Sequence, residues 1–317
     1  VAQIDDAFYL ALTAPNELVR LDGQLKPTGS GLALAGTPTA ITANSFAIVV
    51  GTRSPGTVEV VQPAEWRSLV RREVPEGMVN GSAASTTVVS VVLTASHAWV
   101  TTGGDDGSAD IRRLNVFSGV WEPLPYSGDV TEFDARGVRL RVAGDSVWGV
   151  TTATTPSTLF KLSERRVVEY GGHSNGAIAC ARDVMPLLSG SVAAPGCSTG
   201  VFVLRRTGAV LGVAQTIEAA IVSEKGDWEA QWLTPRVAGH ADSGFVAAVT
   251  VERKTADGTF LPARTQVTAF TAAAIASTAP GARGVGMVSL AAARRCIVAV
   301  VRDTAARHDV VALPATC

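Results

Sequence analysis

The chain carries little charge and almost no lysine. Charged residues make up 17% of its 317 residues, and the formal net charge is −1; soluble domains usually reach about a quarter. Lysine occurs four times against 23 arginines, and the arginines form no basic stripe. A surface that binds nucleic acid needs clustered cations to neutralise phosphates. We therefore expect no nucleic-acid partner.

Long apolar runs and regular helices are also lacking. The run VVSVVL at Val88–Leu93 is only as long as a strand, whereas a membrane-spanning helix needs about 18 apolar residues or more. No membrane span is therefore predicted in this chain. The alanine-rich segment Ala272–Ser277 is too short for a regular helix and falls where an outer strand is due.

Catalytic and metal-binding motifs are absent as well. The chain has four histidines, and none has a His or Cys two to five residues further on: His97, His173, His240 and His308. This excludes the usual zinc spacing. There is no G-x-S-x-G elbow, phosphate loop or paired-carboxylate signature. We predict no metal and no cofactor from these motifs.

Short β-strands, by contrast, follow one another along the chain. Val138–Tyr170 contains four of them, each rich in Val, Thr, Leu or aromatic residues and bounded by Gly, Pro, Asp or Ser: 139–142, 146–152, 158–162 and 166–170. This pattern is typical of an antiparallel meander. A shift of 101 positions, without a gap, places Ser45, Pro55 and Thr57 on Ser146, Pro156 and Thr158. The meander is therefore a repeat.

The repeat occurs in seven copies. Ser45, Ser96 and Ser146 hold the same position in three copies, 51 and 50 residues apart, and fainter copies are anchored at Asp6, Ser198, Ser243 and Arg295. A period of about 45 residues with four strands per unit is typical of a propeller. We predict an all-β, seven-bladed β-propeller of four-stranded antiparallel blades, with six or eight blades as alternatives. The blades should form a single domain over residues 1–317.

One stretch carries a resemblance to known propellers. GDSVWGVTT at 144–152, followed by STLFKL at 157–162, resembles the broad group of seven-bladed propellers that includes virginiamycin B lyase and NHL-type domains. The resemblance implies a fold and no particular activity. The histidine and the magnesium-binding acidic residues of the lyase have no counterparts at matching positions here, so none is carried over.

The four cysteines suggest two local disulfides. Antiparallel strands bring the end of one strand beside the start of the next, and on this basis we pair Cys180 with Cys197 and Cys296 with Cys317. Buried free thiols in a cytosolic protein are the alternative. The chain also begins with Val1 rather than Met, as a processed protein would. Together these features predict a secreted, periplasmic or cell-surface protein.

Charged loops supply the candidate binding residues. In a propeller, the turn between second and third strands shares a face with the connection to the next blade. The candidates expected on this face are Arg53, Asp105, Asp106, His173, Lys225, Asp227, Arg253 and His308. Exposed loops on a rigid scaffold are where binding residues concentrate, although loops are also charged simply because they contact water.

The turn GGDDGSAD raises the question of calcium. Asp105, Asp106 and Asp110 offer the oxygen ligands that Ca²⁺ prefers, but their spacing departs from the EF-hand pattern. A solvated hairpin tip is the simpler interpretation. Calcium at this turn is retained as the minor alternative.

Three functions fit this sequence. The first is a non-catalytic binding or scaffold domain outside the cytoplasm that recognises a protein or a glycan. The second is a lyase- or hydrolase-type enzyme with its site in the central funnel. The third is a structural subunit of a surface assembly. The absence of catalytic motifs favours the first, because propellers commonly serve as platforms.

Overall fold

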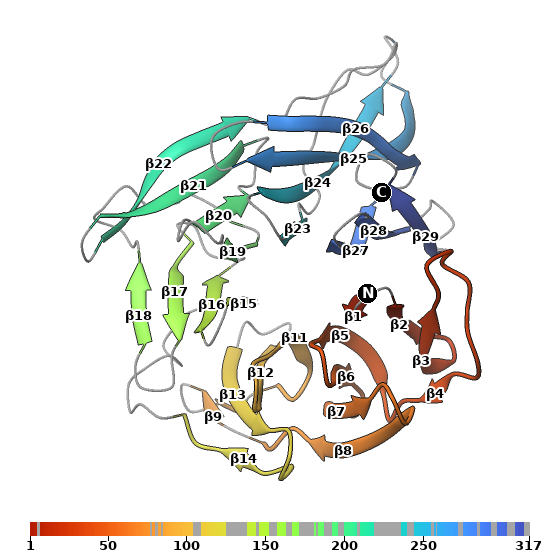
Figure 1. The fold of residues 1–317 in the computed structure, drawn as a ribbon. Coiled ribbons are helices and arrows are strands. Elements are labelled where there is room, and N and C mark those ends of the chain that lie inside the picture. Colours follow the sequence, from red (N-terminus) through yellow and green to blue (C-terminus); the bar gives the residue numbers. More distant parts are fainter. Residues whose placement is uncertain are drawn as a thin grey trace. The chain divides into compact units, whose positions relative to one another are not determined.

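The structure is a computed structural model, and all its regular elements within the described residues are β-strands (Figure 1). The described residues are 1–4, 7–76, 78–79, 82–83, 85–103, 109–124, 138–143, 146–151, 157–162, 167–170, 181, 183–186, 192–195, 200–207, 210–218, 236–239, 244–254, 257, 259–271, 275–283, 286–292, 297–302 and 308–313. The chain divides into two compact units, Val1–Gly172 and His173–Cys317, which we call unit 1 and unit 2. The single domain over residues 1–317 stays a prediction.

The described part of unit 1 contains four meander sheets and one short hairpin. The first sheet is β1 (Ala2–Ile4), β2 (Ala7–Thr13), β3 (Asn16–Leu21) and β4 (Leu32–Ala33); the second is β5 (Thr37–Ala43), β6 (Ile48–Arg53), β7 (Thr57–Gln62) and β8 (Arg67–Glu73). The hairpin is β9 (Met78–Val79) and β10 (Ser82–Ala83). The third sheet is β11 (Val88–Leu93), β12 (His97–Gly103), β13 (Ala109–Asn115) and β14 (Trp121–Glu122), and the fourth is β15 (Val138–Ala143), β16 (Ser146–Thr151), β17 (Leu159–Leu162) and β18 (Val167–Tyr170).

Unit 2 continues with the same kind of sheet. One sheet is β19 (Met185–Pro186), β20 (Val192–Pro195), β21 (Gly200–Thr207) and β22 (Val210–Glu218). The next is β23 (Arg236–Gly239), β24 (Gly244–Lys254), β25 (Phe260–Thr271) and β26 (Ile275–Arg283). The last described sheet has three strands: β27 (Gly286–Ala292), β28 (Ile297–Arg302) and β29 (His308–Leu313).

The repeat anchors predicted the second strands correctly. Each anchor lies directly at or a few residues before the second strand of a sheet: β2, β6, β12, β16, β21, β24 and β28. All pairings between neighbouring strands of these sheets are antiparallel, for example Ser146 with Ala143 and Val147 with Leu162. The prediction of four-stranded antiparallel sheets is therefore confirmed. The number of blades stays a prediction.

The core of unit 1 lies between consecutive sheets. One apolar cluster joins sheets β1–β4 and β5–β8 through Leu18 and Val50, and a second joins β5–β8 to β11–β14 through Val60 and Val100. A third joins β11–β14 to β15–β18, where the buried Trp99 belongs to the same cluster as Phe160. Val- and Ala-rich strands thus bury both faces, which explains the high apolar content at low charge.

Hydrogen bonds also join neighbouring sheets at their first or second strands. The Thr39 hydroxyl donates to the Val88 carbonyl at 2.6 Å, and the Thr101 hydroxyl donates to the Val138 carbonyl at 3.1 Å. These buried or half-buried bonds place each sheet beside the next.

One glycine in a strand is explained by an aromatic ring. Gly149 and Phe160 are cross-strand partners in β16 and β17. A Cβ atom at Gly149 would lie 2.2 Å from Phe160 Cζ, so the fully buried ring occupies the space that a side chain would take. Gly149 is therefore explained by packing.

Some predictions fall outside what the structure describes. All four cysteines, the anchors Asp6, Ser198, Ser243 and Arg295, and His240 lie outside the described residues. The two disulfides therefore stay predictions. Within the described residues, no helix is both long and apolar enough to cross a membrane.

Candidate functional site

The sequence-predicted binding residues are only partly described. Five of them lie outside the described residues: Asp105, Asp106, His173, Lys225 and Asp227. Arg53 is exposed and ends β6 in unit 1. Arg253 lies within β24, where it pairs with Leu261, and His308 begins β29, where it pairs with Arg302. Both were expected in turns, and both belong to strands because these strands extend further than the sequence suggested.

Of the three aspartates in the calcium hypothesis, only Asp110 is among the described residues, and its carboxylate is in an ion pair. Asp110 Oδ2 lies 2.8 Å from Arg112 Nη2. Among the described residues, no group of three or more His, Cys, Asp or Glu side chains is placed to hold a metal ion. Calcium at the 104–108 turn itself lies outside the described residues.

The opposite end of unit 1 gathers the features that sequence reasoning missed. We call the strands of each sheet A to D in chain order, and the end that carries the AB and CD turns the AB/CD face. In a meander, these two turns lie at one end and the BC turn at the other. Arg53 is at the BC end, whereas the AB turn of sheet β5–β8 spans 44–47. An Asn44 Nδ2 bond to the Thr94 carbonyl, at 3.3 Å, joins the AB turns of two neighbouring sheets.

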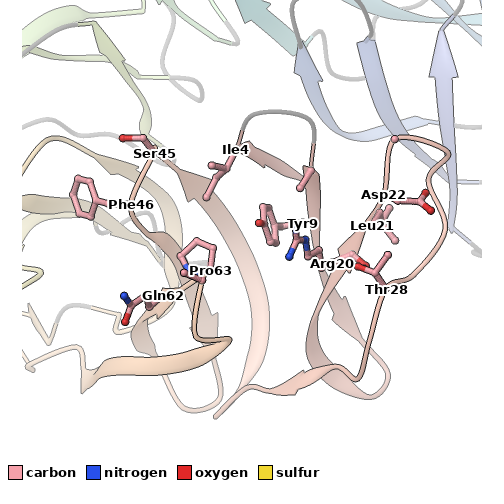
Figure 2. Close-up of a pocket in the computed structure, with 13 residues that line it drawn as sticks. Ile4, Tyr9, Arg20, Leu21, Asp22, Thr28, Ser45, Phe46, Gln62 and Pro63 are labelled. Carbon is pink, nitrogen blue, oxygen red and sulfur yellow. The ribbon is translucent and has the colours of Figure 1, made fainter.

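A cavity of about 850 Å³ opens on this face between sheets β1–β4 and β5–β8 (Figure 2). Its apolar lining includes Ile4, Phe46 and Pro63, and its polar lining includes Arg20 and Gln62. The volume is within the range of about 300–1,000 Å³ that is usual for ligand sites. The cavity is therefore large enough for a small ligand or a short peptide segment.

Cross-strand pairing explains why two polar side chains meet there. Tyr9 of β2 is the direct partner of Arg20 of β3, so their side chains share a face of the sheet. The Tyr9 ring is buried against Trp66, with ring centroids 6.2 Å apart, and Trp66 donates its indole N–H to the Ser30 carbonyl at 2.8 Å. Figure 2 shows Arg20 beside Tyr9, with Pro63 and Phe46 across the cavity.

The two charged side chains among the described lining residues, Arg20 and Asp22, differ in what they bind. Asp22 Oδ1 accepts the backbone N–H groups of Gln24 and Lys26 at 2.8 and 2.9 Å, and thus caps its own loop. Figure 2 shows its carboxylate turned away from Phe46 and Pro63. The Arg20 guanidinium is exposed and makes no hydrogen bond or ion pair within the described part of the chain. A cation is thus left available at the cavity.

Two exposed phenylalanines stack beside the cavity. Phe46 and Phe117 have ring centroids 5.8 Å apart and ring planes 18° apart. Phe46 is 38% exposed and Phe117 71% exposed. Phe46 also lines the cavity. The pair therefore extends the cavity into one surface, with Phe46 from an AB turn and Phe117 from a CD turn.

The same local structure presents both rings. Asn44 Oδ1 accepts the N–H groups of Phe46 and Ala47 at 3.1 and 3.0 Å. Asn115 Oδ1 accepts the N–H groups of Phe117 and Ser118, each at 3.0 Å. These are Asx turns, which the short Asn side chain favours. The signal was present in the sequence as two Asn-x-Phe triplets, N-S-F at 44–46 and N-V-F at 115–117.

A hydrogen-bond network supports the second turn. Glu122 Oε1 accepts from Asn115 Nδ2 at 3.1 Å. Glu122 Oε2 lies 3.0 Å from His97 Nε2 and 2.9 Å from Arg113 Nη2. The hydrogen bond from Asn115 holds the pKa of Glu122 below its ordinary value, with His97 and Arg113 contributing, against a smaller opposing effect of burial. Glu122 thus holds in place the Asn115 side chain that orients Phe117.

The same network contains a Ser–His–Glu line. Ser96 Oγ lies 2.8 Å from His97 Nδ1, and His97 Nε2 contacts Glu122. The side chains of His97 and Arg113 are each only 12% exposed. Because Arg113 and Asn115 also bind the Glu122 carboxylate, the line ties the AB turn to strands β13 and β14. Its geometry therefore suits a structural clamp.

Comparison with known proteins identifies the fold. No protein-family model and no curated protein sequence matches the chain. Solved structures do match. The Myceliophteria thermophila Cps50 (Swd1) β-propeller domain has a TM-score of 0.63 and 10% identity, over 97% of this chain and 94% of that one.

Two further structures agree. Kuenenia stuttgartiensis hydrazine synthase has a TM-score of 0.61 and 13% identity, over 98% of this chain and 94% of that one. Kluyveromyces lactis Hsv2 has a TM-score of 0.60 and 10% identity, over 98% and 95%. At such identities the likeness concerns the fold alone. Together with the four-stranded antiparallel sheets, it shows that the chain is a β-propeller.

Proposed function

We propose that the chain is a non-catalytic binding or scaffold domain that recognises a protein partner through the AB/CD face of unit 1. The observation that carries this proposal is the stacked pair of Phe46 and Phe117, exposed by 38% and 71%. Large apolar side chains gathered at a surface mark interaction sites, and buried aromatic residues dominate the energetics of protein interfaces. A partner surface would remove both rings from water.

The support beneath the rings favours binding over accidental exposure. Each phenylalanine follows an Asx turn, and Asn115 is itself held by Glu122. A surface that is ordered before binding loses less conformational entropy on association. The pair is therefore preorganised to act as an anchor.

Two further elements of the proposal rest on the sequence. The chain would act outside the cytoplasm, with disulfides Cys180–Cys197 and Cys296–Cys317, because local cysteine pairs in a strand-rich chain are typical of oxidising compartments. A protein is preferred to a glycan because the two exposed rings are phenylalanines, which offer no hydrogen-bonding group to sugar hydroxyls, and because aromatic residues are enriched at protein interfaces. Similar folds occur both in a protein that binds a partner and in an enzyme: one matching structure is a complex of KlAtg21 with the coiled coil of AgAtg16, and another is hydrazine synthase.

The test compares three forms of the full chain. The variant Phe46→Ala/Phe117→Ala removes both rings, and Leu69→Ala serves as the control because Leu69 is also an exposed apolar residue, at 45%, but lies in strand β8. Partners are captured by crosslinking from extracts of the source organism, identified, and then measured with purified protein by biolayer interferometry. A glycan array is run in parallel.

The proposal expects the double variant to lose at least about tenfold in affinity for the purified partner, while the control binds as the unaltered chain does. Equal binding by both variants would overturn it. Binding to glycans alone, with no purified protein partner, would replace the protein by a sugar.

The Ser96–His97–Glu122 line favours one second candidate, a hydrolase. Nucleophilic hydrolases combine a serine, a histidine and a carboxylate in the same way, although here Ser96 meets Nδ1 and Glu122 meets Nε2, the reverse of the usual order. Hydrolysis of p-nitrophenyl acetate that disappears in Ser96→Ala would establish this candidate. Unchanged background hydrolysis is the result that the clamp geometry predicts.

A further inference from the structure

The cavity beside Phe46 indicates which chemistry the partner presents. We propose that it receives an acidic side chain of an internal, extended segment of the partner, with the carboxylate on Arg20 and a neighbouring large apolar side chain against Ile4, Phe46 and Pro63. This inference rests on the proposed function, because it identifies what binds at the same face.

Charge complementarity is the first argument. Arg20 lines the cavity without a partner in the described part of the chain, and the Asp22 carboxylate is occupied by the backbone of its own loop. A guanidinium presents a planar set of donors that fits a carboxylate in a bidentate manner. A phosphate would also fit that donor set, but the apolar wall opposite favours a ligand with an adjoining apolar group.

The position of Arg20 is the second argument. Tyr9 is its cross-strand partner and is buried against Trp66, and Figure 2 shows the Arg20 side chain beside the Tyr9 ring. Ile4 and Pro63 line the same cavity, so a bound segment would cover the exposed guanidinium and displace water from it, which strengthens a charge-assisted hydrogen bond. An arginine in this position can recognise a carboxylate by the geometry of its hydrogen bonds as well as by charge.

Continuity with the aromatic pair is the third argument. Phe46 lines the cavity on one side and stacks on Phe117 on the other. A bound chain therefore has apolar surface to follow beyond the cavity. This favours an internal segment of the partner, which continues on both sides of its acidic side chain, over a chain end, where the carboxylate would be the C-terminal group.

The experiment uses the full chain and three labelled peptides, measured by fluorescence anisotropy. The acidic probe is Ac-Gly-Phe-Glu-Phe-Gly-NH₂, the neutral probe has Gln in place of Glu, and the terminal probe is Ac-Gly-Phe-Gln-Phe with a free carboxylate. The variant is Arg20→Gln. The matched control is Arg53→Gln, which removes an exposed arginine at the opposite, BC end of the neighbouring sheet.

The acidic probe should bind the unaltered chain and Arg53→Gln equally, and Arg20→Gln about tenfold to a hundredfold more weakly, as expected for a lost charged hydrogen bond. The neutral probe should bind weakly and be insensitive to Arg20. Equal binding of the acidic and neutral probes, loss in Arg53→Gln instead, or no binding at millimolar peptide overturns the inference. Preference for the terminal probe would overturn the internal segment.

The two proposals fail in different ways. If Phe46→Ala weakens binding of the purified partner, but Arg20→Gln does not weaken binding of the acidic peptide, only the carboxylate inference fails. If Arg20→Gln weakens binding of the acidic peptide but not of the neutral one, while removal of both phenylalanines leaves binding of the partner unchanged, the proposal of an aromatic anchor fails. Circular dichroism and melting of Arg20→Gln should match the unaltered chain, because the side chain is exposed.

Discussion

Removing Arg71 should destabilise unit 1 far more than neutralising the residue that it binds. Glu59 of β7 and Arg71 of β8 are cross-strand partners. Arg71 Nη2 donates to Glu59 Oε1 at 2.8 Å, and Arg71 Nε donates to Glu59 Oε2 at 3.2 Å. The Glu59 side chain is 0% exposed and that of Arg71 is 50% exposed. The carboxylate is thus inside the protein and the guanidinium at its surface.

The magnitude follows from this asymmetry. In Arg71→Met the carboxylate stays buried without its cation, and breaking a buried pair in this way costs about 3–5 kcal/mol. Water can approach from the exposed arginine side, so we expect a loss near the lower end, about 3 kcal/mol. In Glu59→Gln the half-exposed guanidinium regains water and still meets an amide oxygen, so the loss should be about 1 kcal/mol.

The assay is urea denaturation of the full chain, followed by tryptophan fluorescence, with hydrogen exchange of β7 and β8 peptides as a local readout. The double variant Glu59→Met/Arg71→Met should be more stable than Arg71→Met alone, since it removes the uncompensated charge. A loss of less than about 1 kcal/mol in Arg71→Met, or a double variant less stable than Arg71→Met, would refute the reasoning.

Three further predictions concern packing, pH and cysteines. Gly51→Ala should cost about 1–3 kcal/mol in urea denaturation, because its Cβ would lie 2.2 Å from Val88 Cγ1; Gly23→Ala, with open space around it, is the control. The Asn115 hydrogen bond lowers the pKa of Glu122. This carboxylate therefore stabilises the fold above its unfolded pKa, and the stabilisation is lost as pH falls through the folded pKa. Between pH 6 and pH 3, the melting temperature of Glu122→Gln should accordingly fall less than that of the unaltered chain. Mass spectrometry of unreduced peptides should show the disulfides Cys180–Cys197 and Cys296–Cys317, each of which stabilises the fold by about 3 kcal/mol in a loop-entropy model. Alkylation of all four thiols in the native protein would reject both disulfides.

The fold was predictable because it repeats. Strand-length runs of Val, Ala and Thr recur at a fixed period, and each second strand begins at or just after its anchor, as at Ser45, Ser96 and Ser146. Outer strands were harder to place. β4 and β14 have two residues each, which is too short for an alternating pattern, and cross-strand pairing with Leu18 and Leu114 defines them.

In unit 1 the sequence and the tertiary structure point to opposite ends of the sheets. Charge in loops pointed to Arg53 at the BC end, whereas the cavity and the exposed rings lie at the AB/CD end. The Asn-x-Phe triplets carried a local signal, because an Asx turn is set by neighbouring residues alone. Whether a phenylalanine in such a turn is buried or exposed depends on the sheet beside it.

By itself, the sequence determined the strands, their antiparallel order and the all-β class, because strand periodicity and turn residues act over a few neighbouring positions. Only the tertiary structure decided which side chains meet across sheets. Phe46 and Phe117 are 71 positions apart in the chain, and their stacking follows from the packing of sheet β5–β8 on sheet β11–β14. That the Arg20 guanidinium has no partner among the described residues likewise depends on where Asp22 turns. Contacts of this kind arise from the packing of whole sheets, which no local pattern encodes.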